Sequence, residues 1–172
     1  MRDIKRNMYS EIAKSYDELH GEEQLVKYRI VKEFLKKYRH KDWVWLDIGS
    51  GTGLAQEFFK KEFKKALCIE PCKELIDIHL SQARPGIVIN KKIEEIDLRE
   101  KSIDICTSFT SLHHVENLRE IIEKIESWTK KLVVVSMLEK SRKIKKFLEI
   151  VKNRETLLKT RAYKDILVIW KP

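Results

Sequence analysis

The chain has 172 residues, which is enough for one domain with a buried core. Charged residues make up 37% of it, and 36 lysines and arginines against 27 aspartates and glutamates give a formal net charge of +9. No apolar run reaches about 18 residues, and the start from Met1 to Lys5 has no apolar signal-peptide core, so we expect a soluble, cytoplasmic protein with no membrane partner.

Apolar periodicity predicts helices first and then alternating strands and helices. Two helices are expected over 7–20 and 22–38, with Gly21 as the break between them. Further on we expect strands at 43–48, 66–70, 87–89, 103–108 and 131–138, helices at 54–63, 72–83, 116–129 and 141–152, and a hairpin of 156–162 and 165–170. This order predicts an α/β fold with a doubly wound, mostly parallel seven-stranded sheet, helices on both faces and a C-terminal antiparallel hairpin.

No linker, repeat or low-complexity tract is visible, so we expect a single domain over 1–172. Cys68, Cys72 and Cys106 lie in or beside strands without metal-ligand spacing, which favours packed thiols over zinc ligands or disulfides. No metal is therefore expected. The many lysines and glutamates, with only 5 glycines and 3 prolines, favour a thermophilic source.

Three glycines at alternate positions follow the first strand. Gly49, Gly51 and Gly53 come directly after an apolar run, and Asp47 stands two residues before the first of them. Glycines allow a sharp turn and a close approach of the backbone to a ligand. A dinucleotide motif would need its third glycine at Leu54, and a P-loop would need Lys-Ser or Lys-Thr after the last glycine. Neither is present, and Asp47 suits a ligand that carries an ammonium and a sulfonium group.

The Leu-Asp-Ile-Gly-Ser-Gly-Thr-Gly wording at 46–53 resembles the class I S-adenosylmethionine (SAM)-dependent methyltransferases, in their small single-domain "type 11"-like branch. The resemblance implies a Rossmann-like core over 43–172 and SAM as the cofactor. It also implies a cofactor site at the end of the first and fourth strands, made of Asp47, Gly49, Ser50, Gly51, Gly53 and Ser108.

Glu70 ends the second strand, 21 residues after Gly49, where the family holds the ribose hydroxyls. The alternative is a solvated glutamate at a strand end. After the third strand the family usually has an aspartate that accepts from the adenine amino group. Lys92 occupies that position here, and a cation cannot accept a hydrogen bond. Adenine contacts are therefore expected from the Ile93 backbone or from Glu94.

The lead-in around Tyr16 and Asp17 is similar to a Tyr-x-x-Ile-Ala-x-x-Tyr-Asp stretch that folds over the cofactor in the family. By this resemblance residues 1–40 form an N-terminal helical lid, and Tyr16 contacts the methionine end of SAM. The alternative is an aromatic side chain that only anchors an amphipathic helix.

His113 and His114 follow the fourth strand in a Leu-His-His-Val stretch that is also common in the family. Methyl transfer needs a base only for an acceptor that is protonated at neutral pH, and these imidazoles are the candidates. A structural role for the pair is favoured, because the stretch occurs in members with unrelated acceptors. Family members that methylate the exocyclic amines of bases carry Asn/Asp-Pro-Pro-Tyr after the fourth strand. Residues 108–112 contain no proline, so the resemblance argues against such amines as acceptors.

The C-terminal stretch 130–172 holds 13 basic and 4 acidic residues, so it accounts for the whole net charge. A basic rim follows the fifth strand, where the acceptor side of a doubly wound sheet lies; its members are Lys140, Arg142, Lys143 and Lys146. This favours an anionic acceptor, either a small molecule or RNA such as tRNA. A solvated lysine-rich helix face is the alternative. Three hypotheses stay open: a methyltransferase on an undetermined acceptor, an RNA methyltransferase, and a SAM-binding non-catalytic subunit. An activating protein partner is compatible with each, but no motif indicates one.

Overall fold

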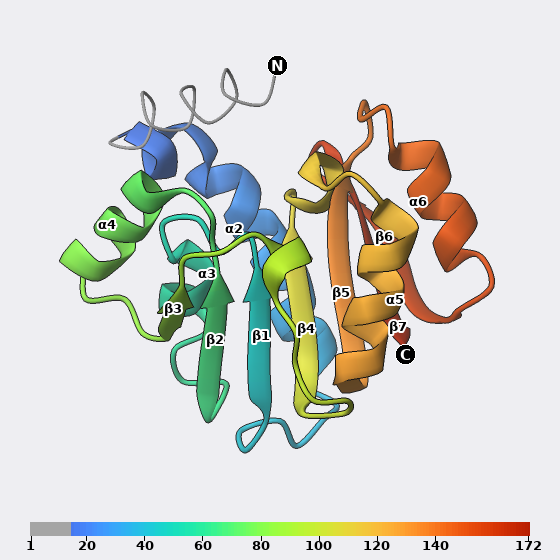
Figure 1. The fold of residues 1–172 in the computed structure, drawn as a ribbon, viewed down its shortest axis with the longest axis horizontal. Helices are drawn as coiled ribbons and strands as arrows, with labels where there is room; N and C mark the ends of the chain where they lie inside the picture. Colours follow the sequence, from blue (N-terminus) through green and yellow to red (C-terminus); the bar gives the residue numbers. More distant parts are fainter. Residues whose placement is uncertain (1–14) are drawn as a thin grey trace.

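The computed structural model describes residues 15–172, which form a seven-stranded sheet in the order β3-β2-β1-β4-β5-β7-β6 (Figure 1). The pairs formed by β1 to β5 are parallel, and β7 lies antiparallel between β5 and β6. The strands are β1 Val44–Ile48, β2 Lys65–Ile69, β3 Ile87–Ile89, β4 Ile103–Phe109, β5 Thr129–Leu138, β6 Glu155–Ala162 and β7 Asp165–Lys171. The predicted fold class, including the C-terminal hairpin, is confirmed.

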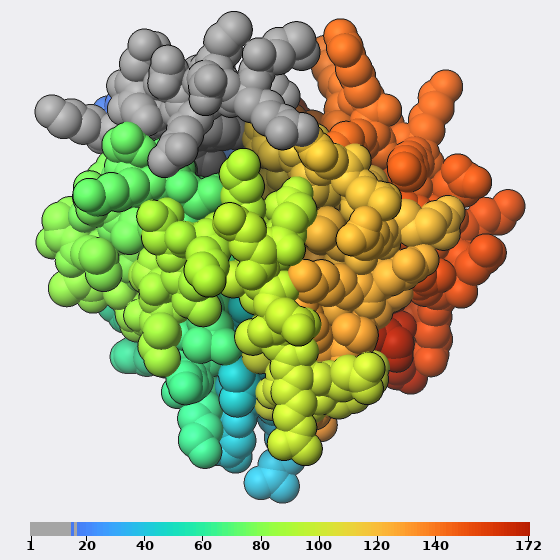
Figure 2. Space-filling model, viewed as in Figure 1, coloured from blue at the N-terminus to red at the C-terminus, as the bar shows by residue number. Residues whose placement is uncertain are grey.

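Helices cover both faces of the sheet. They are α2 Tyr16–Leu35, α3 Leu54–Phe58, α4 Lys73–Ser81, α5 Leu118–Trp128 and α6 Ile144–Val151, with short 3-10 turns η2 Ile93–Glu95 and η3 Leu112–His114. One apolar cluster joins α2 and α3 to the sheet around Trp45, and the other joins α5 and α6 to it around Val133. Figure 2 shows the second face, where the side chains of α5 and α6 cover the right-hand part. Each face thus has its own buried core.

The predicted break at Gly21 is wrong, because α2 runs through it without interruption. Gly21 is buried, and a Cβ built on it would lie 3.9 Å from Leu54 Cδ2. That distance is an ordinary van der Waals contact, so glycine is not sterically required here. The packing of α2 against the core outweighs the cost of one glycine within a helix, which is about 1 kcal/mol. The part of the predicted first helix before residue 15 lies outside the described residues.

Several predicted helix ends are also corrected. Helix α3 ends at Phe58 rather than at residue 63, because the following turns direct Phe59 and Phe63 back onto Trp45. Helices α5 and α6 are likewise shorter than predicted at both ends. Across residues 15–172, no helix is both long and apolar enough to cross a bilayer.

Candidate active site

The glycine loop, residues 49–53, connects β1 to α3 and adopts a backbone that requires glycine. Gly49 and Gly53 have φ values of +71° and +82°. A Cβ on Gly49 would lie 2.3 Å from Ser111 Cβ, and one on Gly53 would lie 2.4 Å from the Nδ1 atom of His79. The loop is therefore pressed between the segment after β4 and helix α4, with no space for side chains at these two positions.

Glu70 fastens this loop to the end of β2. Its Oε2 accepts from the Gly51 amide at 2.9 Å, and its Oε1 accepts from the Cys72 amide at 2.9 Å. The carboxyl is only 6% exposed, and this burial raises its pKa to about 6 in spite of the two hydrogen bonds. Each carboxylate oxygen can accept a second hydrogen bond, so Glu70 still has acceptor capacity for hydroxyl groups.

Asp47 lies beneath the loop and is 2% exposed. Its two oxygens accept from Thr107 Oγ1 at 2.5 Å and from Gln56 Nε2 at 2.8 Å. Burial raises its pKa to about 6, and the two donors offset only part of that effect. Neither Asp47 nor Glu70 forms an ion pair with any residue between 15 and 172. Two buried acids therefore lie beside the loop with neutral donors as their only partners.

A narrow cavity of about 30 Å³ lies between the glycine loop and α2. One wall comes from the loop and its neighbours, and the other from α2 and the end of β4; the lining residues are Asp17, His20, Gly21, Gln24, Tyr28, Asp47, Gly49, Ser50, Gly51, Thr52, Leu54 and Phe109. The hydroxyl of Ser50 is buried here and has no hydrogen-bond partner among the described residues. A buried polar atom without a partner, in a cavity beside a glycine loop, is the arrangement expected of a ligand site.

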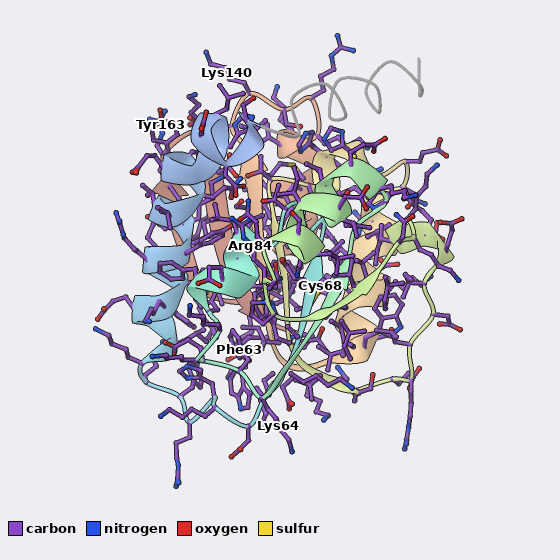
Figure 3. All side chains as sticks on the ribbon, turned by 90° about the vertical axis from the view of Figure 1, so that its left-hand side faces the viewer. Phe63, Lys64, Cys68, Arg84, Lys140 and Tyr163 are labelled. Carbon is purple, nitrogen blue, oxygen red and sulfur yellow. The ribbon has the colours of Figure 1, made fainter. Side chains whose placement is uncertain are left out.

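Helix α2 is held against the loop by an ionic contact that we call the Arg84 clamp, formed by Asp17, Thr52 and Arg84. The guanidinium of Arg84 donates to Asp17 Oδ2 at 2.6 Å, to the Thr52 carbonyl at 2.9 Å and to Thr52 Oγ1 at 3.0 Å. The Thr52 hydroxyl in turn donates to Asp17 Oδ1 at 2.5 Å. Figure 3 shows Arg84 on the side of the molecule where α2 and α4 approach each other. The clamp therefore closes the cavity from the side of α4.

The remaining residues predicted for the cofactor site are not among those that line the cavity. Ile93, the first residue of η2, is buried in the core, whereas Glu94 is exposed. Ser108 is fully buried, and its hydroxyl lies 2.5 Å from Ser111 Oγ. Tyr16 is the first residue of α2, but its side chain lies outside the described part of the structure.

His113 and His114 form η3 at the carboxyl end of β4, with ring centroids 3.8 Å apart. The Lys143 ammonium donates to the carbonyl of Val115, so the basic segment after β5 lies against this turn. Lys140, Arg142 and Lys146 are exposed and form no ion pair with any residue from 15 onward. The structure thus brings the predicted bases and the predicted basic rim to one edge of the sheet.

Sequence reasoning missed the contribution of α2 beyond Tyr16. Asp17, His20, Gln24 and Tyr28 line the cavity at a spacing of three or four residues. This spacing places them on one face of the helix. The same face is visible in the sequence, but only the fold shows that it meets the loop rather than solvent. The three cysteines are free and buried, in agreement with packed thiols.

Comparison with known proteins agrees with this geometry. Residues 46–135 match the model of a methyltransferase domain family. A search of curated proteins finds no match. Among solved structures, a chain of the complex between the Haloferax volcanii Trm112 methyltransferase activator and its candidate methyltransferase superposes with a TM-score of 0.76 and 10% identity, over 96% of both chains.

Two further structures extend this comparison. Magnesium protoporphyrin IX methyltransferase from Synechocystis, solved with bound SAM, has a TM-score of 0.72 and 12% identity, over 88% of this chain and 80% of that one. A SAM-dependent methyltransferase from Aquifex aeolicus has a TM-score of 0.64 and 12% identity, over 83% and 88%. At these identities the likeness shows the fold.

Proposed function

The chain belongs to the methyltransferase domain family, and we propose that it transfers a methyl group from SAM to an anionic acceptor held at the carboxyl edge of β4 and β5. The observation that carries this proposal is the cavity at the glycine loop. Its lining includes the buried Asp47 carboxyl and the Ser50 hydroxyl, which has no hydrogen-bond partner among the described residues, and the buried Glu70 carboxyl lies beside the loop. Neither carboxyl pairs with a cation between residues 15 and 172. A ligand with hydroxyl groups and positive charge would supply what each of these groups lacks.

The residues present fit SAM. Glu70 would accept from the ribose hydroxyls, and Ser50 with the loop would contact the amino-acid end. Asp47 would provide negative charge near the ammonium and the sulfonium. When bound, SAM supplies a methyl group that is already activated by the positive sulfur. The protein then contributes position, since a near-attack geometry accounts for about 7–11 kcal/mol of such a barrier.

The cavity must widen before SAM can enter. Sites for small molecules usually enclose about 300–1,000 Å³, whereas this one encloses about 30 Å³. The first turn of α2 is the part of this wall that can move, because the Arg84 clamp holds it to the loop, whereas Lys27 and Tyr28 anchor the rest of α2 in the core. We infer that residues 1–40 act as the lid, with Asp17 and Arg84 separating and re-forming their contact around the cofactor.

On the acceptor side, Lys140, Arg142 and Lys146 have no counter-charge among residues 15–172. Other basic residues of the C-terminal stretch are neutralised, as in Arg154 with Glu126 and Arg161 with Glu139. An anionic group on the acceptor would pair with the uncompensated charges, and His113 or His114 would accept a proton where the acceptor carries one. RNA is the second candidate acceptor, favoured because Lys145 on α6 extends the same exposed basic surface.

The test has two stages, with cofactor binding first. Calorimetry should detect SAM and its demethylated product binding to the full chain, and absence of both would overturn the proposal. Labelled SAM should next be offered with RNA, protein and small-molecule fractions separately. A chain that binds SAM but transfers no label to any of these fractions would be a non-catalytic subunit.

The basic rim is tested with Lys140→Ala/Arg142→Ala/Lys146→Ala, which spares Lys143 because that side chain holds η3. SAM affinity should stay unchanged while acceptor affinity falls. For RNA, the log–log slope of affinity against salt should flatten by about one unit per lost phosphate contact. A matched control is Lys36→Ala/Lys41→Ala/Lys152→Ala, which removes the same charge from other surfaces. Equal effects of both variants would remove the rim from the acceptor site.

A further inference from the structure

A second pocket lies at the amino ends of β1, β2 and β3, at the opposite end of these strands from the glycine loop. It encloses about 330 Å³, and its walls come from β1, from α3 with the turns after it, and from the segment before β3. In Figure 3, Phe63 and Lys64 mark this region, well below Arg84 and Lys140. The pocket therefore belongs neither to the proposed cofactor site nor to the basic rim.

Aromatic rings form much of the pocket wall. Trp45 lies 5.0 Å from Phe63 and 5.6 Å from Phe59, measured between ring centroids. Trp45 and Phe59 are only 1% and 2% exposed, so the half-buried Phe63 supplies most of the ring surface that a ligand can contact. The indole N–H of Trp45 donates to Thr107 Oγ1. Ile87 adds an aliphatic side chain that is 50% exposed. Such walls favour a flat apolar ligand, because offset and edge-on ring contacts stabilise it beyond simple area burial.

A single polar group, Gln56, lies in the wall. The side chain is fully buried, and its Nε2 donates to Asp47 Oδ2 at 2.8 Å. Its Oε1 has no hydrogen-bond partner among residues 15–172. The amide cannot rotate to change this, since rotation would set its oxygen against the Asp47 carboxylate. A ligand N–H or O–H that reached the pocket floor would give Oε1 the donor that it lacks.

Positive charge surrounds the opening. Lys64 and Lys65 are exposed at the rim and form no ion pair with any described residue, whereas the neighbouring Lys60 pairs with Glu57. The residues that line the pocket include no aspartate or glutamate. The rim thus attracts an anionic group, while the floor accepts a hydrogen bond and the walls pack against a ring.

We propose that this pocket is a second ligand site, specific for a small planar aromatic anion that carries an N–H or O–H donor. The aromatic walls hold the ring, Gln56 accepts from the donor, and Lys64 with Lys65 pair with the anionic group. The pocket lies apart from the proposed SAM and acceptor sites, although Gln56 also donates to Asp47 beside the glycine loop.

Indole-3-acetate is the probe that contains all three features, and it should be titrated into the ¹⁵N-labelled full chain without any cofactor. The Trp45 indole N–H and the Gln56 side-chain amide should shift in a saturable manner. 1-Methylindole-3-acetate lacks the donor and indole-3-ethanol lacks the charge, so each should bind severalfold more weakly. Saturable shifts confined to the glycine loop, or no saturation at all, would overturn the proposal.

Charge reversal at the rim provides the matched comparison. Lys64→Glu/Lys65→Glu should weaken indole-3-acetate binding about tenfold and leave indole-3-ethanol unaffected. Lys152→Glu/Lys159→Glu makes the same change in net charge on α6 and β6 and should leave both affinities within a factor of about two. Equal weakening by the two variants would show general attraction to a basic protein rather than a site. SAM binding is measured separately, so failure here leaves the proposed function untouched.

Discussion

Buried acids lie at two places along the edge of the sheet formed by the carboxyl ends of the parallel strands. They differ in whether a buried cation balances their charge. Among residues 15–172, Asp47 and Glu70, beside the glycine loop, accept hydrogen bonds only from neutral donors, and burial raises the pKa of each to about 6. Asp165, at the start of β7, is fully buried as well, but its Oδ2 lies 3.0 Å from the fully buried ammonium of Lys27. Thr110 and Ser136 donate to the same oxygen at 2.6 Å and 2.7 Å.

The difference separates a structural joint from a ligand site. The Lys27–Asp165 pair connects α2 to β7 and, through the two hydroxyls, to β4 and β5. Its charges are balanced inside the protein. At neutral pH Asp47 and Glu70 carry negative charge that no described residue balances, and burying this charge lowers the stability of the fold. A cationic or hydroxyl-bearing ligand can interact with these carboxylates. A buried carboxylate without a cation thus indicates a ligand site here, whereas a buried carboxylate paired with a lysine indicates a structural role.

The largest effect is expected at the joint. Lys27→Met keeps the length of the side chain but leaves Asp165 as a buried charge without a counter-ion, so the free energy of unfolding should fall by about 3–5 kcal/mol. Urea unfolding measures this loss. The double variant Lys27→Met/Asp165→Asn should recover most of it, because no charge remains. A loss below about 1 kcal/mol in the single variant would show that the pair is no joint.

A smaller effect, on binding, is expected at Glu70. Glu70→Ala should weaken SAM binding by about 1.5–3 kcal/mol, the range for hydrogen bonds to a charged group. Wild-type affinity should also decline as the pH falls through about 6, because Glu70 and Asp47 then become protonated. Calorimetry at several pH values tests both. Glu149→Ala, at an exposed position on α6, serves as the control, and an equal loss there would remove Glu70 as the ribose ligand.

The smallest effect is expected at Asp47, and it is the only predicted gain in stability. The folded state raises its pKa from 3.8 to about 6 and so binds a proton that the unfolded chain releases. This group therefore lowers wild-type stability as the pH rises from about 4 to about 6, and the deficit persists above that range. Asp47→Asn abolishes the titration, and Gln56 can reverse its amide to match. We expect about 1–3 kcal/mol of added stability at pH 7.

Thermal unfolding across pH measures this gain, which should shrink toward zero near pH 4. Weaker SAM binding should accompany it, since the stabilised variant loses the negative charge offered to the ligand. Asp77→Asn, at an exposed position on α4, is the matched control. A variant that is less stable than wild type at pH 7 would contradict the assignment of Asp47 as uncompensated.

Local sequence patterns determined the glycine loop and most strand positions of this protein. The glycine loop could be predicted because Gly49 and Gly53 stand where the backbone needs a positive φ and lies too close to neighbouring side chains for a Cβ. Strand positions and the closing hairpin followed from runs such as Val133–Val135 and from the turn at Tyr163 and Lys164. The family resemblance rested on the Leu-Asp-Ile-Gly-Ser-Gly-Thr-Gly motif at 46–53 and was confirmed by the match over 46–135.

Only the tertiary structure decided which distant groups meet. Nothing in the sequence joins Lys27 to Asp165, Gln56 to Asp47, or Arg84 to Asp17, because each pair depends on strand register and on the angle at which α2 crosses the sheet. Gly21 illustrates the limit. Its low helix propensity predicted a break, but the packing of α2 into the core through Tyr28, Val31 and Leu35 outweighs about 1 kcal/mol of propensity. Propensity is set by neighbours in the chain, whereas burial and charge compensation are set by neighbours in space.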